Sequence, residues 1–145
     1  MKERYLKSVR LLSECYHAFE QLSAGHIRNS GLTPSQFDIL ATLGNTPGMC
    51  FRELGEKTLI TKGTLTGVVD RLELKGLVKR DVLTGDRRMT IVQLTSEGET
   101  TFARLFSPHI AFCKQWFDGY SPEDFDALEH VLVRLQRDLT SDKGS

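Results

Sequence analysis

The sequence lacks the features that mark membrane, secreted and disulfide-rich proteins. No apolar run in its 145 residues approaches the ~20 residues needed to cross a bilayer, and MKERYLKSVR at the N-terminus is too charged for a signal peptide. The three cysteines, Cys15, Cys50 and Cys113, are odd in number and far apart. They indicate a reducing cytoplasm rather than a disulfide framework.

The sequence also lacks the residue patterns of an enzyme or a metal protein. It contains no glycine-rich phosphate loop, no Ser/His/Asp set and no dense Cys/His cluster. Cys15 and His17 are two apart on an expected helix, so they point to different faces. His109 and Cys113 share a face, but a metal ion needs more ligands than two. We therefore expect no enzymatic activity, no metal and no cofactor.

The formal net charge is zero, but the charges are unevenly distributed. Residues 61–90 carry seven basic and four acidic side chains, a balance of +3, and residues 91–145 carry five and nine, a balance of −4. Binding to a polyanion requires a basic patch and not a basic protein. Residues 61–90 are the segment that would supply such a patch.

Apolar residues recur at helical spacing near both ends of the chain. The N-terminal stripe is Tyr5, Val9, Leu12, Tyr16 and Phe19, and the C-terminal stripe is Phe125, Leu128, Leu132, Leu135 and Leu139. The N-terminal stripe is either an ordinary core-facing helix surface or a surface that also pairs with another chain. Because the end helices are more apolar than a 60-residue middle segment could cover, pairing across a two-fold axis would bury the excess.

The middle of the chain predicts a helix-turn-helix. Thr33-Pro34-Ser35-Gln36 begins a helix with a capping box and proline at the first position, and Gly44 permits a left-handed residue that ends it. A short helix follows at 51–58. Thr61 caps another helix, which Gly76 ends.

Two β-branched segments after this helix, 77–83 and 89–94, predict a hairpin, joined through TGDRR (84–88). Thr95 caps a long helix to about residue 117, with Pro108 as a kink, and Ser121 begins the last helix. The expected fold is mostly α with a small β-hairpin wing. We predict one domain, 1–145, with a winged helix-turn-helix at 32–95 between dimerisation helices at 1–31 and 96–145.

This order of elements resembles the MarR family of bacterial transcriptional regulators. The resemblance rests on LTPSQFDIL, LGEKTLITKGTLTGVVDRLELKGLVKR and DRRMTIVQLTSEG, and it is densest from residue 32 to 98. It implies a homodimer that binds palindromic double-stranded DNA, usually as a repressor. It also implies release by a small phenolic or anionic ligand or by thiol oxidation. The expected dimer contacts are Tyr5, Val9, Leu12, Trp116, Phe117, Phe125, Leu128, Leu132 and Leu135.

The start of the helix after Thr61 is suited to reading DNA. Base edges in the major groove are read by short side chains near the leading end of a helix. We expect Thr64 and Thr66 to contact bases, and Lys62 to contact a phosphate or a guanine. Gly63 and Gly67 lack a Cβ and would allow close approach. Further phosphate contacts are expected from Arg71 and, less directly, Ser35.

The loop TGDRR is expected to enter the minor groove, which is narrow and electronegative at A·T tracts. The family pattern Asp-x-Arg maps onto Asp86 and Arg88, so that Asp86 would hold Arg88 and Arg87 would contact a phosphate. The alternative is a solvated charged turn. Asp70 and Glu73 must face away from DNA or pair with a neighbour such as Arg71 or Lys75.

The resemblance also implies an effector pocket, with His17, His26, Arg28 and Phe37 as lining residues. A core role for Phe37 is the alternative. Peroxide-sensing relatives use a cysteine in the first helix, which makes Cys15 a redox candidate. Its alternative role is that of a buried small hydrophobe. A rival function is a winged-helix module that binds protein and never contacts DNA.

Overall fold

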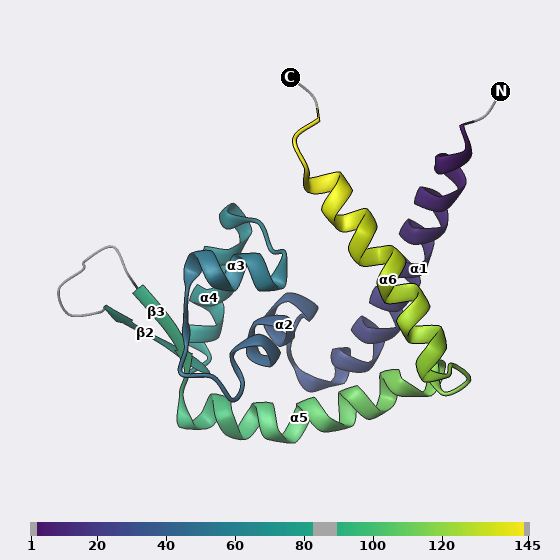
Figure 1. Cartoon of the computed structure of the whole chain (residues 1–145). Helices are drawn as coiled ribbons and strands as arrows, with labels where there is room; N and C mark the ends of the chain where they lie inside the picture. Colours follow the sequence, from purple (N-terminus) through teal and green to yellow (C-terminus); the bar gives the residue numbers. More distant parts are fainter. Residues whose placement is uncertain (1–2, 83–89, 144–145) are drawn as a thin grey trace. The chain divides into compact units, whose positions relative to one another are not determined.

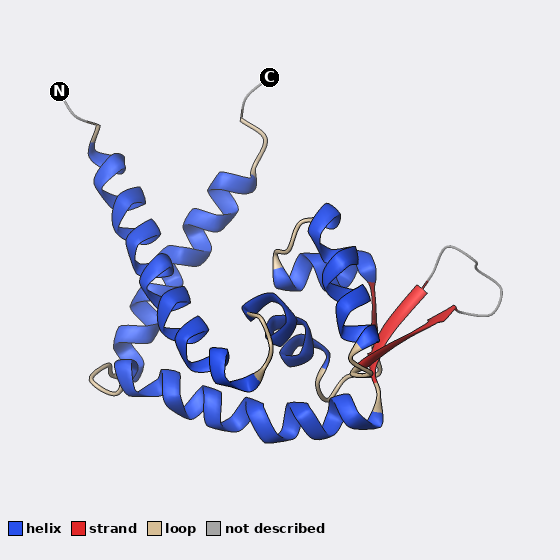
Figure 2. Ribbon diagram, turned by 180° about the vertical axis from the view of Figure 1, so that it is seen from behind, coloured by secondary structure: helices blue, strands red, loops and turns tan. Residues whose placement is uncertain are grey.

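The computed structural model describes residues 3–82 and 90–143. The chain divides into two compact units, residues 1–112 and 113–145, and each is described by itself. Helices provide most of the structure, with a small antiparallel sheet in the first unit (Figures 1 and 2). The expected mostly α fold with a small hairpin is confirmed. No helix in the described ranges combines the length and apolar character needed to span a bilayer.

The first unit begins with α1 (Arg4–Ile27), a 24-residue helix followed by a 3-10 turn, η1 (Arg28–Ser30). Ile27 at its end joins the hydrophobic core. The apolar stripe predicted along the helix is exposed, with Tyr5 at 62% and Val9 at 52% of full exposure. In this unit the stripe is therefore not a core-facing surface.

Helix α2 (Pro34–Leu43) begins as its sequence predicts. The Thr33 hydroxyl accepts from the Gln36 N–H at 3.2 Å, and the Gln36 side chain accepts from the Thr33 N–H at the same distance. Both bonds satisfy N–H groups that a helix start leaves free. Ile39, Leu40 and Leu43 then bury one face of the helix in the core.

Gly44 ends α2 for a different reason from the one predicted. Its φ is −57°, outside the left-handed region, and Asn45 takes the positive φ of 60° instead. A Cβ on Gly44 would overlap the ring of Phe102. Glycine is therefore required here by close packing against α5 (Ser96–Lys114) and not by backbone conformation.

Helices α3 (Phe51–Thr58) and α4 (Lys62–Leu74) form the predicted helix-turn-helix. Leu59 connects them in the left-handed conformation, with φ 60°. Leu54 on α3 is fully buried, and α4 buries one complete face. The buried residues of α4 are Leu65, Val68, Val69 and Leu72, as predicted. Burial of each contributes about 1.5–3 kcal/mol. Gly76 ends this segment with φ 75°.

The sheet has three strands, β1 (Met49–Cys50), β2 (Val78–Val82) and β3 (Thr90–Leu94), in the order β1-β3-β2. The β2–β3 hairpin was predicted from the sequence, and β1 was not. Val78 pairs with Leu94 at one end of the hairpin, and Val82 pairs with Thr90 at the other. In Figure 1 the hairpin extends outward beside α3 and α4.

Helix α5 begins where predicted, because the Thr95 hydroxyl accepts from the Gly98 N–H at 3.0 Å. It continues through Pro108 to Lys114. Gly98 packs directly on the Leu77 carbonyl, since a Cβ there would overlap that group. The start of α5 is thereby held against the end of the helix-turn-helix.

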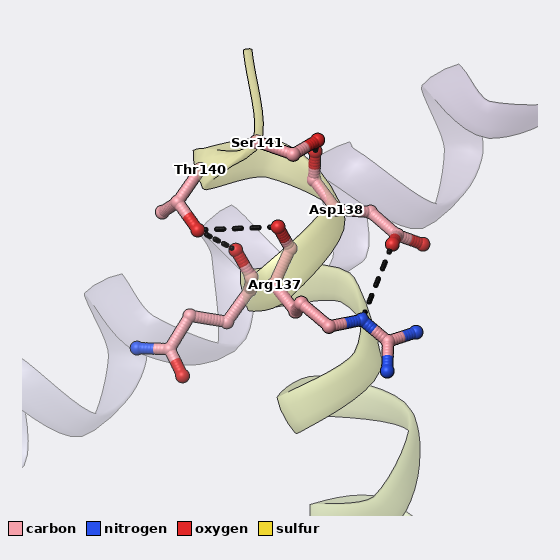
Figure 3. Close-up of polar contacts among 5 residues, drawn as sticks. Arg137, Asp138, Thr140 and Ser141 are labelled. Atoms are coloured by element: carbon pink, nitrogen blue, oxygen red, sulfur yellow. Dashed lines mark hydrogen bonds and ion pairs between the residues drawn. The ribbon is translucent and has the colours of Figure 1, made fainter. Parts of the chain in front are cut away.

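The second unit contains the turn η2 (Gln115–Phe117) and helix α6 (Pro122–Thr140). Helix α6 begins after Ser121 as expected, and Ser121 and Asp124 form a capping box there. At the other end, Figure 3 shows Thr140 directed back at the preceding turn. Its hydroxyl donates to the Gln136 carbonyl at 2.9 Å, and the Ser141 hydroxyl donates to Asp138 at 2.7 Å. These side-chain hydroxyls add hydrogen bonds to carbonyl groups of the last turns of α6.

Candidate nucleic-acid interface

The outer face of α4 is polar and accessible along its first half. Lys62, Gly63, Thr64 and Thr66 are exposed and Gly67 is half-buried, while the opposite face lies in the core. Arg71, two turns further on, is also exposed. The residues predicted to contact DNA are therefore gathered on one accessible surface. Their roles in binding stay predictions.

The two glycines of α4 are not required by packing within the chain. A Cβ on Gly63 would meet nothing within 4 Å, and one on Gly67 would meet the Arg71 guanidinium at an ordinary 3.8 Å. At Gly44 and Gly98, by contrast, a Cβ would overlap neighbouring atoms. Each interior glycine costs a helix roughly 0.5–1 kcal/mol relative to alanine. The open space beside Gly63 and Gly67 thus favours a role in approach by another molecule.

The start of α4 differs from the prediction in one detail. Thr61 occupies the capping position with extended backbone, but its side chain makes no cap hydrogen bond. Its hydroxyl donates instead to the Thr64 hydroxyl at 3.2 Å. The first backbone N–H groups of α4 are consequently left without this cap, at the end of the helix where the macrodipole favours anions.

The acidic residues of α4 have a partner other than the neighbours expected. Arg80 on β2 donates through Nη2 to Asp70, and its Nε lies 3.6 Å from Glu73 Oε1. Lys75 instead donates to the Gly31 carbonyl at 2.9 Å and to Gln36 at 3.1 Å. Sequence reasoning missed Arg80. The signal was present in Asp70 and Glu73, two carboxylates on the proposed DNA-facing helix that were expected to pair with a cation or to face away from DNA.

The wing is described only at its base. Asp86, Arg87 and Arg88 lie outside the described residues, so their predicted minor-groove and phosphate contacts stay predictions. The strands on either side are in register, and Gln93 on β3 donates across to Asp81 on β2. The described parts of the hairpin end at the paired residues Val82 and Thr90.

Ser35, the remaining predicted phosphate contact outside the wing, lies on α2 and not on α4. It is the second residue of α2 and is half-buried. The first turn of α2 is already capped by Thr33. A phosphate contact by Ser35 stays a prediction.

Two of the four residues predicted to line an effector pocket converge on His109. His26 Nδ1 lies 2.9 Å from His109 Nδ1, and the Phe37 ring meets His109 edge-on at 4.7 Å between centroids. Ser23 Oγ hydrogen-bonds to His109 Nε2 at 2.9 Å, and the Phe112 ring stacks on His26. Burial lowers the pKa of His109, and His26 adds to this effect. His109 is thus held neutral near pH 7.

The other two predicted pocket residues, His17 and Arg28, are exposed. Sequence reasoning considered His109 only together with Cys113 and missed its pairing with His26, which is 83 residues distant. No local pattern marks such a pair. Within residues 3–82 and 90–143, no group of three or more histidine, cysteine or acidic side chains could hold a metal ion.

The cysteines differ in accessibility. Cys15 is exposed on α1 in the single chain, so it is not part of the core of this unit. Cys50 is half-buried. Cys113 is buried, and burial raises the pKa of its thiol above the usual range. Exposure distinguishes Cys15 from the other two.

The residues predicted to form dimer contacts are largely accessible. Tyr5, Val9 and Leu12 on α1 are exposed, as are Trp116, Phe117 and Leu128. Phe125, Leu132 and Leu135 are half-buried on α6. The Phe117 and Phe125 rings are 6.2 Å apart in the second unit. Apolar surface of this extent marks interaction sites in soluble proteins.

The α3–α4 pair, the following hairpin and the polar outer face of α4 define a winged helix-turn-helix, a class of nucleic-acid-binding fold. A sequence model of the MarR family matches residues 32–90. The HTH-type transcriptional regulator MhqR of Bacillus subtilis (strain 168) is 31% identical over 93% of this chain and 93% of its own length. The chain belongs to the MarR family of transcriptional regulators.

Two further comparisons agree with this assignment. The homoprotocatechuate degradative operon repressor of Escherichia coli is 29% identical over 73% of this chain and 72% of its own. Sco3205, a MarR family transcriptional regulator from Streptomyces coelicolor solved in complex with DNA, has the same fold, with a TM-score of 0.85 and 23% identity. The match covers 100% of this chain and 94% of Sco3205. The predicted family and fold class are thereby confirmed.

Proposed function

We propose that this MarR family regulator is a cytoplasmic homodimer that represses transcription by binding a palindromic operator. The outer face of α4 enters the major groove, with Thr64 and Thr66 at base edges and Lys62, Arg71 and Ser35 at or near phosphates. Residues 86–88 of the wing address the adjacent minor groove. The observation that carries this proposal is the accessible polar face of α4, where Gly63 and Gly67 have no packing role inside the chain.

The exposed apolar residues of the end helices support dimerisation. Residues 1–31 and 96–145 supply these helices in the proposed domain plan, and 32–95 supply the DNA-binding lobe. A two-fold arrangement would present two copies of α4 to the two halves of a palindrome. Gel filtration with light scattering measures the mass directly. A monomer at micromolar concentration would contradict this part of the proposal.

The proposed effector is a small aromatic or anionic molecule that releases the operator. Support comes from the cluster of aromatic and histidine rings around His109, near the predicted residues His26 and Phe37. His17 and Arg28 extend the proposed lining. A relative named as repressor of homoprotocatechuate degradation favours a phenolic acid. Titration of the protein–operator complex with a panel of aromatic acids would identify such a ligand.

The test of DNA binding is fluorescence anisotropy with the duplex upstream of the protein's own gene. Affinity should fall steeply with salt, because the contacts are largely to phosphates. Arg88→Ala should weaken binding by about 10- to 100-fold, the range for a groove-inserted arginine. Arg104→Ala removes the same charge from an exposed position on α5 and should leave affinity nearly unchanged. Full affinity in Arg88→Ala would exclude the wing from the mechanism.

The same measurement separates the rival functions. A protein-interaction module would ignore random duplex even at low salt, whereas a DNA-binding repressor retains weak non-specific affinity. The exposure of Cys15 favours thiol oxidation as a second route of release. Mild peroxide would then dissociate the wild-type complex but not that of Cys15→Ser. Retention of the operator by both proteins after oxidation would remove this route.

A further inference from the structure

Helix α4 carries an electrostatic conflict on its outer face. Asp70 lies one turn beyond Thr66 and therefore on the same face of the helix. With Lys62 and Arg71 balanced by Asp70 and Glu73, the formal charge of residues 62–74 is zero. Both carboxylates are about half exposed, at 54% and 45%. A helix that must approach a polyanion thus presents two negative groups to it.

Arg80 on β2 resolves this conflict. Its guanidinium contacts both carboxylates, Asp70 through Nη2 and Glu73 through Nε. The same group lies over the ring of Phe51 on α3, with Cζ 5.4 Å from the centroid, in cation–π geometry. One side chain therefore contacts both helices of the helix-turn-helix from the base of the wing.

The Arg80 side chain is enclosed more than those of its partners. It is 28% exposed, and its Nε is buried without a hydrogen-bond partner among the described residues. The Glu73 carboxylate at 3.6 Å provides electrostatic compensation for that atom. A partly desolvated charge pair of this kind is screened less by salt than a surface pair.

We propose that Arg80 is a positioning residue for DNA recognition, which neutralises Asp70 and Glu73 on α4 and fixes the base of the wing against both helices. This inference rests on the proposed function, in which α4 enters the major groove. Without Arg80 the two carboxylates repel phosphate and the strand loses its tie to α4. Arg80 thereby acts through its partners and makes no DNA contact of its own.

The test compares the operator affinity of five proteins by anisotropy between about 50 and 200 mM salt, where phosphate-dominated binding changes most. These are wild type, Arg80→Met, the triple variant Arg80→Met/Asp70→Asn/Glu73→Gln, the control Lys79→Met and the control triple variant Lys79→Met/Asp70→Asn/Glu73→Gln. Arg80→Met should bind roughly tenfold more weakly at the lowest salt, and the deficit should shrink as salt rises. The triple variant should recover most of the wild-type affinity, because the repelling charges are gone.

Lys79→Met is matched because Lys79 is the adjacent residue of β2, is exposed and carries the same charge. If Lys79→Met loses a small part of the operator affinity, that loss should remain when Asp70→Asn and Glu73→Gln are added to the Lys79→Met protein. A direct phosphate contact by Arg80 predicts that the triple variant stays as weak as Arg80→Met, and that result would overturn the proposal. Wild-type affinity in Arg80→Met itself would do the same.

Thermal unfolding of each variant accompanies the binding measurements. If Arg80→Met does not fold, Arg80→Lys takes its place, since lysine keeps the charge but loses the two-pronged guanidinium. The operator affinity of Arg80→Lys should lie between that of wild type and that expected for Arg80→Met. Adding Asp70→Asn and Glu73→Gln to Arg80→Lys should restore the wild-type affinity. Failure of that restoration overturns the inference. Failure of the wild type to bind any duplex would instead overturn the proposed function, and this inference with it.

Discussion

Gly67→Ala should make the protein more stable and worse at binding its operator. Gly67 lies inside α4, and the added Cβ would meet the Arg71 side chain at an ordinary 3.8 Å. Replacing an interior helical glycine by alanine therefore adds about 0.5–1 kcal/mol to the free energy of unfolding. For a chain of this size, that gain raises Tm by about 2–4 °C per kcal/mol.

The effect on DNA binding has the opposite sign. The added methyl group stands on the face proposed to approach the duplex, so contacts along α4 must lengthen or tilt. A loss of about 1.4 kcal/mol would weaken binding tenfold. Gly63→Ala should act in the same direction on affinity. Its gain in stability should be smaller, because Gly63 is only the second residue of the helix.

Gly25→Ala is the matched control. Gly25 lies in α1, where a Cβ would also meet nothing within 4 Å. This variant should gain stability without loss of operator affinity, and the gain should be closer to that of Gly63→Ala because Gly25 is the third-last residue of α1. Calorimetry and anisotropy on the three alanine variants give both quantities. Gly67→Ala could instead be more stable than wild type and bind the operator equally tightly. Gly67 would then have no role in the close approach of α4 to DNA, and its lack of a packing role inside the chain would need another reason.

Two further predictions concern stability. Gly44→Ala should lower the free energy of unfolding by about 1–3 kcal/mol in urea denaturation, because the new Cβ overlaps Phe102; an unchanged midpoint would contradict this packing argument. The lowered pKa of His109 means that the unfolded chain binds a proton more readily than the folded one. Stability should therefore be full above about pH 6.5 and fall as pH drops toward the lowered folded pKa, with a smaller fall in His109→Gln. Equal pH dependence in the two proteins would exclude His109 as its source.

The helices and their starts were predictable because their signals are local. The capping box at Thr33 lies within four residues and forms as predicted, and α6 begins at Ser121 as predicted. The buried face of α4 follows from helical spacing alone. Strand β1 escaped prediction because it is two residues long and pairs with β3, more than 40 residues away.

The features that the sequence did not reveal depend on distant partners. Gly44 resembles a helix-ending glycine, and only the position of Phe102 shows its packing role. Arg80 resembles an ordinary exposed strand residue until β2 is placed beside α4. The His26–His109 pair joins α1 to α5. In each case the chemistry of one residue is fixed by a tertiary contact that local patterns do not encode.

The pairing of Val82 with Thr90 has a practical consequence for protein engineering. Because these two residues face each other across the hairpin, any segment replacing 83–89 would be grafted onto neighbouring anchor points. The sheet would hold these anchor points in place, because β3 pairs with both β2 and β1, and β1 leads directly into α3. If the wing contacts DNA as proposed, wings transplanted from other family members would change the preferred operator and leave the sequence of α4 unaltered.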